Sequence, residues 1–242
     1  MRNSVLTSLA LMLCHGMQAQ ADTPLTYEAH YEAHANGLSA KAERSLSALD
    51  DGSYLLDMQL DASIMWKTVA SLEQSSRFEF TDDGLRTQAY DYQLSGIREN
   101  HRSVDFDWAQ GHALSREDDE SWDITLDGQT YDPLSHQYEL RQALLRGERG
   151  EQEYFVIEND EIEPLRYRVI GEEILETPLG RLNTIKMERV RPPSSKRSTV
   201  IWFASDWQFL LARIEQVSGS GLHIEMELDS AELDGEPVTP LQ

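Results

Sequence analysis

The sequence predicts a mainly β fold, either a strongly curved antiparallel sheet or a half-open β-barrel, with one capped α-helix. Three observations lead to this prediction. Apolar and polar residues alternate with a period of two along much of the chain, short glycine-containing turns separate the alternating runs, and one segment, 131–147, has helix start and stop signals. Half-buried runs joined by short turns pair with their sequence neighbours, so we expect mostly antiparallel pairing.

The first 21 residues have the features of a secretory signal peptide. Arg2 precedes an apolar run, and Ala19 and Ala21 form an A-x-A cleavage signal before Asp22. The apolar run is too short to span a bilayer as a stable helix. We therefore predict a cleaved signal peptide at 1–21 and a periplasmic protein.

Cysteine usage gives a second constraint. Cys14, the one cysteine of the chain, lies in the predicted signal peptide, and Leu13 before it departs from a lipobox, which requires a small residue there. Cleavage before Asp22 would leave no cysteine, which excludes disulfides, thiol catalysis and thiolate metal sites. No later segment approaches the apolar length of a membrane span. We predict a single β domain at 22–234 and a flexible C-terminal tail at 235–242.

The chain is strongly acidic, with 21 Lys and Arg against 43 Asp and Glu and a net charge of −22. Such a surface repels the phosphates of nucleic acids and anionic lipid head groups, so we expect no nucleic-acid partner. We interpret the acid excess as a solubility feature rather than as a means of recruiting a cationic partner.

The first strand is predicted in LTYEAHYEAH, 25–34, where Leu25, Tyr27, Ala29, Tyr31 and Ala33 share one face. Later runs repeat the alternation, and the residues expected on the inner face are Tyr54, Leu56, Met58, Leu60, Val104, Phe106, Trp108, Ile224, Met226 and Leu228. Turns are predicted at 50–52, 82–84, 109–111, 127–128 and 219–221, and an exposed loop at 191–197.

The helix is predicted in YDPLSHQYELRQALLRG, with Asp132 as N-cap, Pro133 at the first helical position and Gly147 closing the C-terminus. We expect an apolar stripe on its buried side, formed by Leu134, Tyr138, Leu144 and Leu145. We expect the remaining side chains to face away or to lie at the edge of the stripe, namely Arg141, Gln142 and Arg146.

The segment TVIWFA, 199–204, is apolar on both faces, with Val200 and Trp202 pointing one way and Ile201 and Phe203 the other. A strand of this kind needs cover on both sides. We therefore expect the helix to close one side or end of the curved sheet against this strand.

Four stretches together resemble the DUF3108 family of exported bacterial proteins: YDPLSHQYELR, PLRYRVIGEEILETPLGRLNTIKMERV, STVIWFASDWQFLLARIE and IEMELDSAEL. The most specific parts are the Asp-Pro-Leu helix start, the turn at 177–180 and the pair of strands between Trp202 and Arg213. Leu211 stands where many relatives have proline, which implies a less rigid strand start. The resemblance implies an exported, β-rich protein and no established activity.

The sequence contains no strong motif for a metal site or for catalysis. His30 and His34 have the i, i+4 spacing of a helical zinc pair, but on a strand this spacing separates them by roughly 13 Å, so we predict no metal site. The acidic runs at 117–120 and 158–163 lack the frame of a calcium loop, and GSG at 219–221 lacks the elbow of a catalytic serine. Phosphate-binding loops and dinucleotide fingerprints are absent from the sequence. We predict no catalytic residue and no cofactor.

The inner face is expected to be rich in aromatic residues, and it forms either a filled core or a cavity for an apolar ligand. Tyr138 and Trp202 are the predicted ligand-binding residues, because helix and covered strand could border one interior. The leading hypothesis is a noncatalytic periplasmic binding or accessory factor for an apolar ligand or an envelope protein. The alternatives are a periplasmic hydrolase and, less favoured, an outer-membrane β-barrel.

We predict that the protein isolated from the periplasm begins at Asp22, because Ala19 and Ala21 suit the small pockets of signal peptidase. Intact-mass spectrometry measures this directly. A mass that includes Met1 would contradict the prediction.

Overall fold

The computed structural model describes residues 25–35, 38–64, 67–96 and 99–242. The predicted signal peptide and its cleavage site lie outside the described residues. The first half of the chain forms eight strands, which are β1 (Tyr27–Ala35), β2 (Leu38–Ala48), β3 (Tyr54–Ile64), β4 (Lys67–Thr81), β5 (Gly84–Gly96), β6 (Asn100–Asp107), β7 (His112–Glu117) and β8 (Glu120–Thr125).

The second half contains one α-helix and a second series of strands among the described residues. These elements are β9 (Thr130–Tyr131), α1 (Ser135–Leu145), β10 (Gln152–Glu158), β11 (Glu161–Thr177), β12 (Gly180–Arg189), β13 (Ser198–Ala204), the 3-10 turn η1 (Ser205–Trp207), β14 (Leu210–Val217), β15 (His223–Leu233) and β16 (Glu236–Pro237). The mainly β fold with one helix is confirmed.

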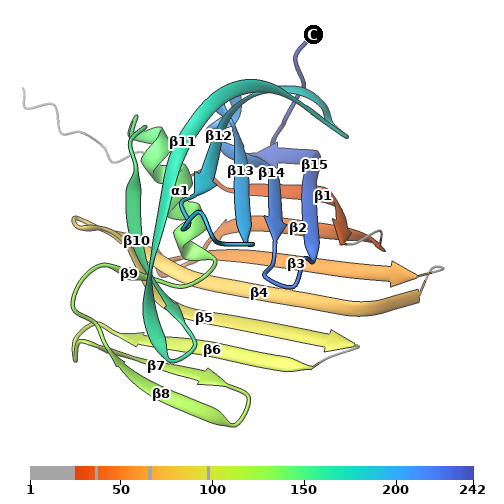
Figure 1. Cartoon of the computed structure of the whole chain (residues 1–242). Coiled ribbons are helices and arrows are strands. Elements are labelled where there is room, and N and C mark those ends of the chain that lie inside the picture. Colours follow the sequence, from red (N-terminus) through yellow and green to blue (C-terminus); the bar gives the residue numbers. More distant parts are fainter. Residues whose placement is uncertain (1–24, 36–37, 65–66, 97–98) are drawn as a thin grey trace, which may run out of the picture.

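The strands of the described residues all belong to one 16-stranded sheet, in which β1 pairs with β15 and so joins two series of neighbouring strands. We name β1–β8 the N-terminal wing and β9–β15 the C-terminal wing. Pairing is antiparallel except between β9 and β10, which are parallel. In Figure 1 the strands β12–β14 run steeply across those of the N-terminal wing, and β11 arches over them. The sheet is therefore strongly curved, as predicted.

The far edge of the C-terminal wing returns to the N-terminal wing. The side-chain amide of Gln129, just before β9, donates a hydrogen bond to the backbone carbonyl of Leu85 in β5. This link brings the edge strand β9 close to the middle of the first wing, although the two strands are not paired in the sheet. The half-open barrel of the prediction is thus a coiled sheet that curls back on itself.

The period-two pattern is confirmed in β1, where Tyr27, Ala29, Tyr31 and Ala33 are buried and the residues between them are exposed. Leu25 precedes the strand and is 37% exposed, so it does not belong to the buried face. The β13 segment is covered on both sides, because Ile201, Trp202 and Phe203 are all buried.

Both ends of α1 are satisfied by the residues expected there. The carboxylate Oδ1 of Asp132 accepts hydrogen bonds from the backbone N–H groups of Leu134 at 2.6 Å and Ser135 at 2.8 Å. Gly147 has φ +82°, and the N–H groups of Gly147 and Glu148 donate to carbonyls of the last turn. This is the Schellman arrangement of a helix C-terminus. The regular helix starts at Ser135, two residues after Pro133, because 133–134 form a turn.

The predicted apolar stripe is wrong in part. Leu134, Tyr138 and Leu144 are buried, but Leu145 is 40% exposed, whereas Arg141 is only 4% exposed and Leu140 is fully buried. An amphipathic stripe presumes one face toward solvent. The coiled sheet surrounds this helix on most sides, so its first turns have little solvent-facing surface and only its last turn is open.

Arg141 is accommodated in the interior by polar and aromatic partners. Its Nε donates to the backbone carbonyl of Gln208 at 2.7 Å, and its guanidinium carbon lies 5.2 Å from the ring centroid of Tyr27 and 5.6 Å from that of Tyr138. Cation–π contacts and a charge-assisted hydrogen bond offset part of the cost of burying the charge.

The C-terminal segment 235–242, for which we predicted a flexible tail, contacts the sheet in this structure. Val238 is buried, and its N–H donates to the carbonyl of Ala231. The N–H of Leu241 donates to the carbonyl of Arg181, and the Thr239 carbonyl accepts from the indole of Trp207.

Two leucines of α1 with different exposure provide a matched test of its packing. We expect Leu140→Ala to lower the free energy of unfolding by about 2 to 5 kcal/mol, because it leaves a cavity in a closed core. Leu145→Ala removes the same atoms from an exposed position and should cost well under half as much. Chemical denaturation of both variants measures the difference, and equal losses would show that the helix is not enclosed as described.

Candidate ligand-binding cavity

Tyr138 lies in the filled part of the interior. Its side chain is 2% exposed, and its ring centroid lies 5.2 Å from that of Phe78 and 6.4 Å from that of Phe80, both in β4. The free space beside it, toward Ile201 and Phe203, is only about 10 Å³. This is about the room that a single water molecule needs. The region around Tyr138 is therefore core.

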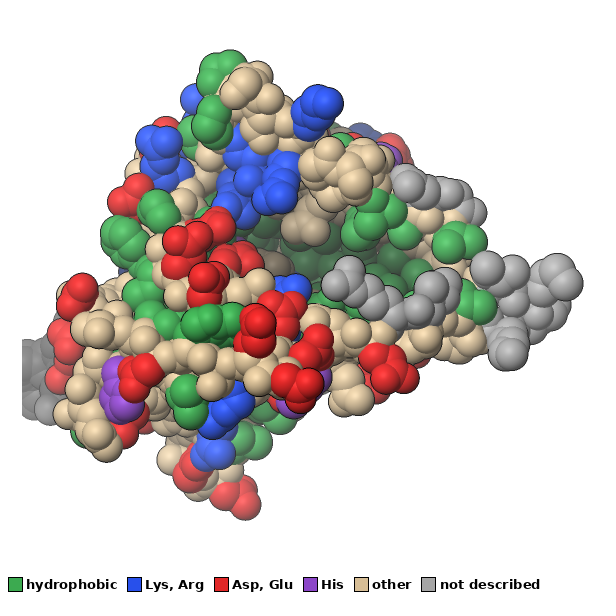
Figure 2. Space-filling model, turned by 60° about the horizontal axis from the view of Figure 1, so that its bottom comes forward, with side chains coloured by type: hydrophobic (Ala, Val, Ile, Leu, Met, Phe, Trp, Pro, Cys, Tyr) green, Lys and Arg blue, Asp and Glu red, His purple; other side chains and the backbone are tan. Residues whose placement is uncertain are grey.

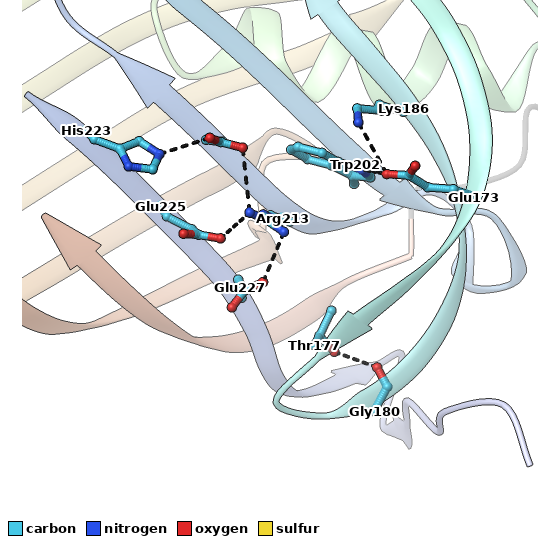
Figure 3. Close-up of polar contacts among 10 residues, drawn as sticks. Glu173, Thr177, Gly180, Lys186, Trp202, Arg213, His223, Glu225 and Glu227 are labelled. Atoms are coloured by element: carbon cyan, nitrogen blue, oxygen red, sulfur yellow. Dashed lines mark hydrogen bonds and ion pairs between the residues drawn. The ribbon is translucent and has the colours of Figure 1, made fainter. Parts of the chain in front are cut away.

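Trp202 lies on the other side of β13 from Ile201 and Phe203, which face Tyr138. The structure consequently does not bring Tyr138 and Trp202 to one interior. The indole Nε1 of Trp202 donates to Glu173 of β11 at 2.5 Å, and cationic groups of the two flanking strands, Lys186 and Arg213, lie over its ring at 4.7 and 4.9 Å from the centroid (Figure 3). Ligand binding by Tyr138 and Trp202 remains a prediction.

The contacts of Trp202 form a polar cover on the outer side of β13. The hydrogen bond from Trp202, followed by the charge of Lys186, lowers the pKa of Glu173. Arg213 also forms ion pairs with Glu225 and Glu227 of β15, as Figure 3 shows. The predicted turn at 177–180 joins β11, which carries Glu173, to β12, which carries Lys186. In this turn the hydroxyl of Thr177 donates to the Gly180 carbonyl at 2.9 Å.

A hollow of about 570 Å³ lies on the inner side of the C-terminal wing. Its walls come from the start of α1, from β10–β15, and from the loops that join β12 to β13 and β14 to β15. The volume falls in the range of small-molecule binding sites, about 300 to 1,000 Å³. Figure 2 shows a hollow with hydrophobic side chains inside it and a group of Lys and Arg side chains at its rim.

The apolar part of the cavity is built from alternate residues of neighbouring strands. Leu165 of β11 and Ile201 of β13 are buried at its base, and Ile214 of β14 and Ile224 of β15 are half-buried beside them. Cross-strand pairing explains the grouping, since Ile214 is the partner of Ile201 and lies in the strand next to Ile224. Leu222, in the turn before β15, is 37% exposed at the opening.

The charged part of the cavity contains three arginines, Arg189, Arg191 and Arg197, and one acid, Glu158. Arg189 is paired with Glu163 at 3.4 Å. Burial, and then the positive charge of Arg189, lower the pKa of Arg191. Burial, and then the negative charge of Glu163, raise the pKa of Glu158.

His136 lies at the cavity wall with both ring nitrogens engaged. Nδ1 lies 3.2 Å from the carbonyl oxygen of Asp132, which only accepts, and Nε2 lies 3.2 Å from the hydroxyl of Tyr167. We therefore assign the proton to Nδ1, and the Tyr167 hydroxyl donates to Nε2. Burial lowers the pKa of His136 to about 4, so the ring is neutral near pH 7.

The histidines considered for a metal lie on the outer surface. His30 and His34 are both exposed on β1. Glu28, His30 and Glu43 bring three ligand atoms within 4.8 Å of one another, and all three residues are exposed. The ring nitrogens of His30 lie 3.2 Å from Glu28 and 3.7 Å from Glu43, which is the geometry of an exposed ion pair. Surface ion pairs of this kind are common, and this one gives no support for a bound metal.

The cavity residues were missed by the sequence reasoning. The loop 191–197 was correctly predicted to be exposed, but its three basic residues, Arg191, Lys196 and Arg197, were a usable signal because they are concentrated in an otherwise acidic chain. The apolar residues at the base of the cavity gave no signal of their own, since alternation alone does not distinguish a cavity wall from core.

A family model described as "Protein of unknown function (DUF3108)" matches residues 26–229. The crystal structure of a beta-barrel-like protein of domain of unknown function DUF1849 from Brucella abortus is similar to this chain, with a TM-score of 0.56 and 9% identity over 86% of this chain and 98% of that chain. At this identity the likeness concerns the fold alone. No curated protein matches, and the helix found among the described residues lacks the length and apolar character to cross a membrane.

The buried imidazole predicts a stability profile in acid. His136 has a pKa of about 4 when folded and an ordinary value of 6.5, so the unfolded state binds more protons between these values and stability falls as the pH drops. The loss approaches about 1.4 kcal/mol per pH unit within the window. Urea unfolding from pH 7 to 4 should show a shallower slope for His136→Asn. Tyr167→Phe keeps the buried imidazole, so it should be less stable than the wild-type protein at every pH while its stability falls with pH at the same rate. If stability fell at the same rate in the wild-type protein and in both variants, His136 would not be the cause of the acid sensitivity.

Proposed function

We propose that this chain, which belongs to the DUF3108 family of proteins of unknown function, is a noncatalytic periplasmic binding protein for a small molecule with an apolar body. The observation that carries the proposal is the 570 Å³ hollow, which apolar side chains of β11, β13, β14 and β15 line. A concave site of this size with apolar side chains at its base and a few polar groups around them is the usual form of a small-molecule binding site.

The surroundings of the hollow support a binding role. The core beside Tyr138 is filled, while the space next to it is left open, so the opening is a local feature and not the result of loose packing throughout. The start of α1 contributes Pro133, His136 and Gln137 to the wall. Hydrogen bonds to the helix cap and to the sheet hold His136 and Gln137, which gives the cavity a preformed shape.

The noncatalytic part of the proposal rests on His136. A general base needs a ring nitrogen free to reach a substrate proton. Both nitrogens of His136 are engaged by Asp132 and Tyr167, and the lowered pKa keeps the ring neutral rather than poised near pH 7. The periplasmic part rests on the signal-peptide features of residues 1–21, as argued from the sequence.

Filling the hollow should abolish binding. We expect Ile214→Trp to weaken binding of a fluorescent apolar probe by about tenfold or more, because the indole occupies the free space. Ile174→Trp is the matched control, since Ile174 is 50% exposed on β11 and lies outside the cavity wall. Fluorescence titration of the mature protein, with thermal melting to confirm folding, makes the comparison.

Mass spectrometry of the protein as isolated from the periplasm complements the titration, because a tightly held ligand copurifies. Saturable binding that is equal in the wild-type protein and the Ile214→Trp variant would place the ligand elsewhere. Lack of saturable binding and of any copurified molecule would reject the carrier role and favour an accessory factor that acts on an envelope protein. A panel of generic hydrolase substrates tests the remaining alternative.

A further inference from the structure

The cavity has a charge opposite to that of the chain. The protein carries 43 acidic residues and 21 Lys and Arg, yet the cavity wall contains three arginines and one glutamate. From the composition of the chain, acidic residues should outnumber basic ones in a cavity wall by about two to one. Figure 2 shows the same contrast, with Lys and Arg side chains gathered at the hollow and acidic side chains across from them. The local sign of the charge is therefore a property of the site.

The arginines are short of anionic partners. Among the described residues, the buried Nε of Arg191 has no hydrogen-bond partner, and no ion pair is formed by Arg191 or Arg197. Arg189 forms one ion pair, with Glu163, whose side chain is 45% exposed. Burial is the main cause that lowers the pKa of Arg191, and the positive charges of Arg189 and Arg197 lower it further, against an opposite effect of Glu163. Glu158 and Glu163 offset part of the repulsion among the three arginines, and an anion bound between the guanidinium groups would offset more of it.

The arginines and the apolar wall occupy different depths. Arg197 is exposed, Arg189 and Arg191 are half-buried, and Leu165 and Ile201 are buried at the base. A molecule that filled the hollow would thus meet guanidinium groups near the opening and, below them, apolar side chains together with the buried polar groups of His136, Tyr167 and Thr199. Arginine is suited to this place because its planar guanidinium binds carboxylate or phosphate through two parallel hydrogen bonds.

We propose, resting on the binding role above, that the ligand is an anionic amphiphile whose carboxylate or phosphate head binds Arg189, Arg191 and Arg197 while its hydrocarbon chain lies between Ile201, Ile214 and Ile224. The arginines select the head group and the isoleucines hold the chain. A cationic amphiphile is repelled at the opening, and a neutral one leaves the guanidinium groups without a partner.

Four probes with the same twelve-carbon chain test the proposal: dodecanoate, dodecyl phosphate, dodecanol and dodecyltrimethylammonium. Each is titrated into the mature protein below its micelle concentration. We expect the two anions to bind about tenfold or more tightly than the alcohol, and the ammonium to bind most weakly. Arg191→Gln should weaken the anions by about ten- to a hundredfold and leave the alcohol nearly unchanged. Arg168→Gln is the control, because Arg168 is exposed on β11, pairs with Glu188 and lies outside the cavity wall.

The outcomes separate this proposal from the broader one. If all four probes bind alike, the head-group assignment is wrong and the binding role stands. If none binds saturably, both fail. Inorganic phosphate is added as a competitor, and displacement of dodecyl phosphate at equal concentration would show a site for free anions, which also overturns the proposal. If Arg191→Gln does not fold, Arg197→Gln in the exposed loop replaces it, with the same loss of head-group preference expected.

Discussion

A buried hydrogen-bonded path across the interior fixes the position of α1, and the rest of the structure depends on it. Ser76 of β4 donates to the Asp132 carboxylate at 2.6 Å, the Asp132 carbonyl accepts from His136, and Tyr167 of β11 donates to the other ring nitrogen. The path joins one wing of the sheet to the other through the start of the helix. Asp132 is fully buried, and removing any member would leave a polar group without a partner in a low dielectric.

The cavity is a consequence of this position. The same turn of helix that holds the path also supplies Pro133, His136 and Gln137 to the wall, and Arg44 of β2 donates to Gln137 at 2.9 Å from the opposite wing. Further along the helix, Tyr138, Leu140 and Leu144 fill the core. One helix therefore separates a packed part of the interior from an open part, and both the polar contacts at its start and the buried Leu165 and Ile201 lie at the boundary between them.

The local parts of the fold could be predicted from the sequence, and the nonlocal parts could not. Alternation identified the strands, and Asp132 and Gly147 identified the helix, because these signals act within a few residues. The exposure of Leu145 and the burial of Arg141 were mispredicted, because a helix that a coiled sheet covers on most sides has no single buried face. The pattern of 199–204 correctly put Ile201 and Trp202 on opposite faces, but which face meets the helix depends on how the sheet coils, and this also decides where the arginines of the loop 191–197 point.

The pairing of β1 with β15 also has a consequence for how the chain acquires its structure over time. Nearly every other strand pairs with its neighbour in sequence, so hairpins of the N-terminal wing can form early. The pairing of β1 with β15, which joins Tyr27 to Leu233, can form only after almost the whole chain is in place. Until then β1 presents an unpaired edge with alternating buried-type side chains, which is a template for pairing with another chain. The high contact order of this one ladder makes it a slow step. Aggregation during refolding is consequently governed by the concentration of chains that have completed the first wing and lack the last strands.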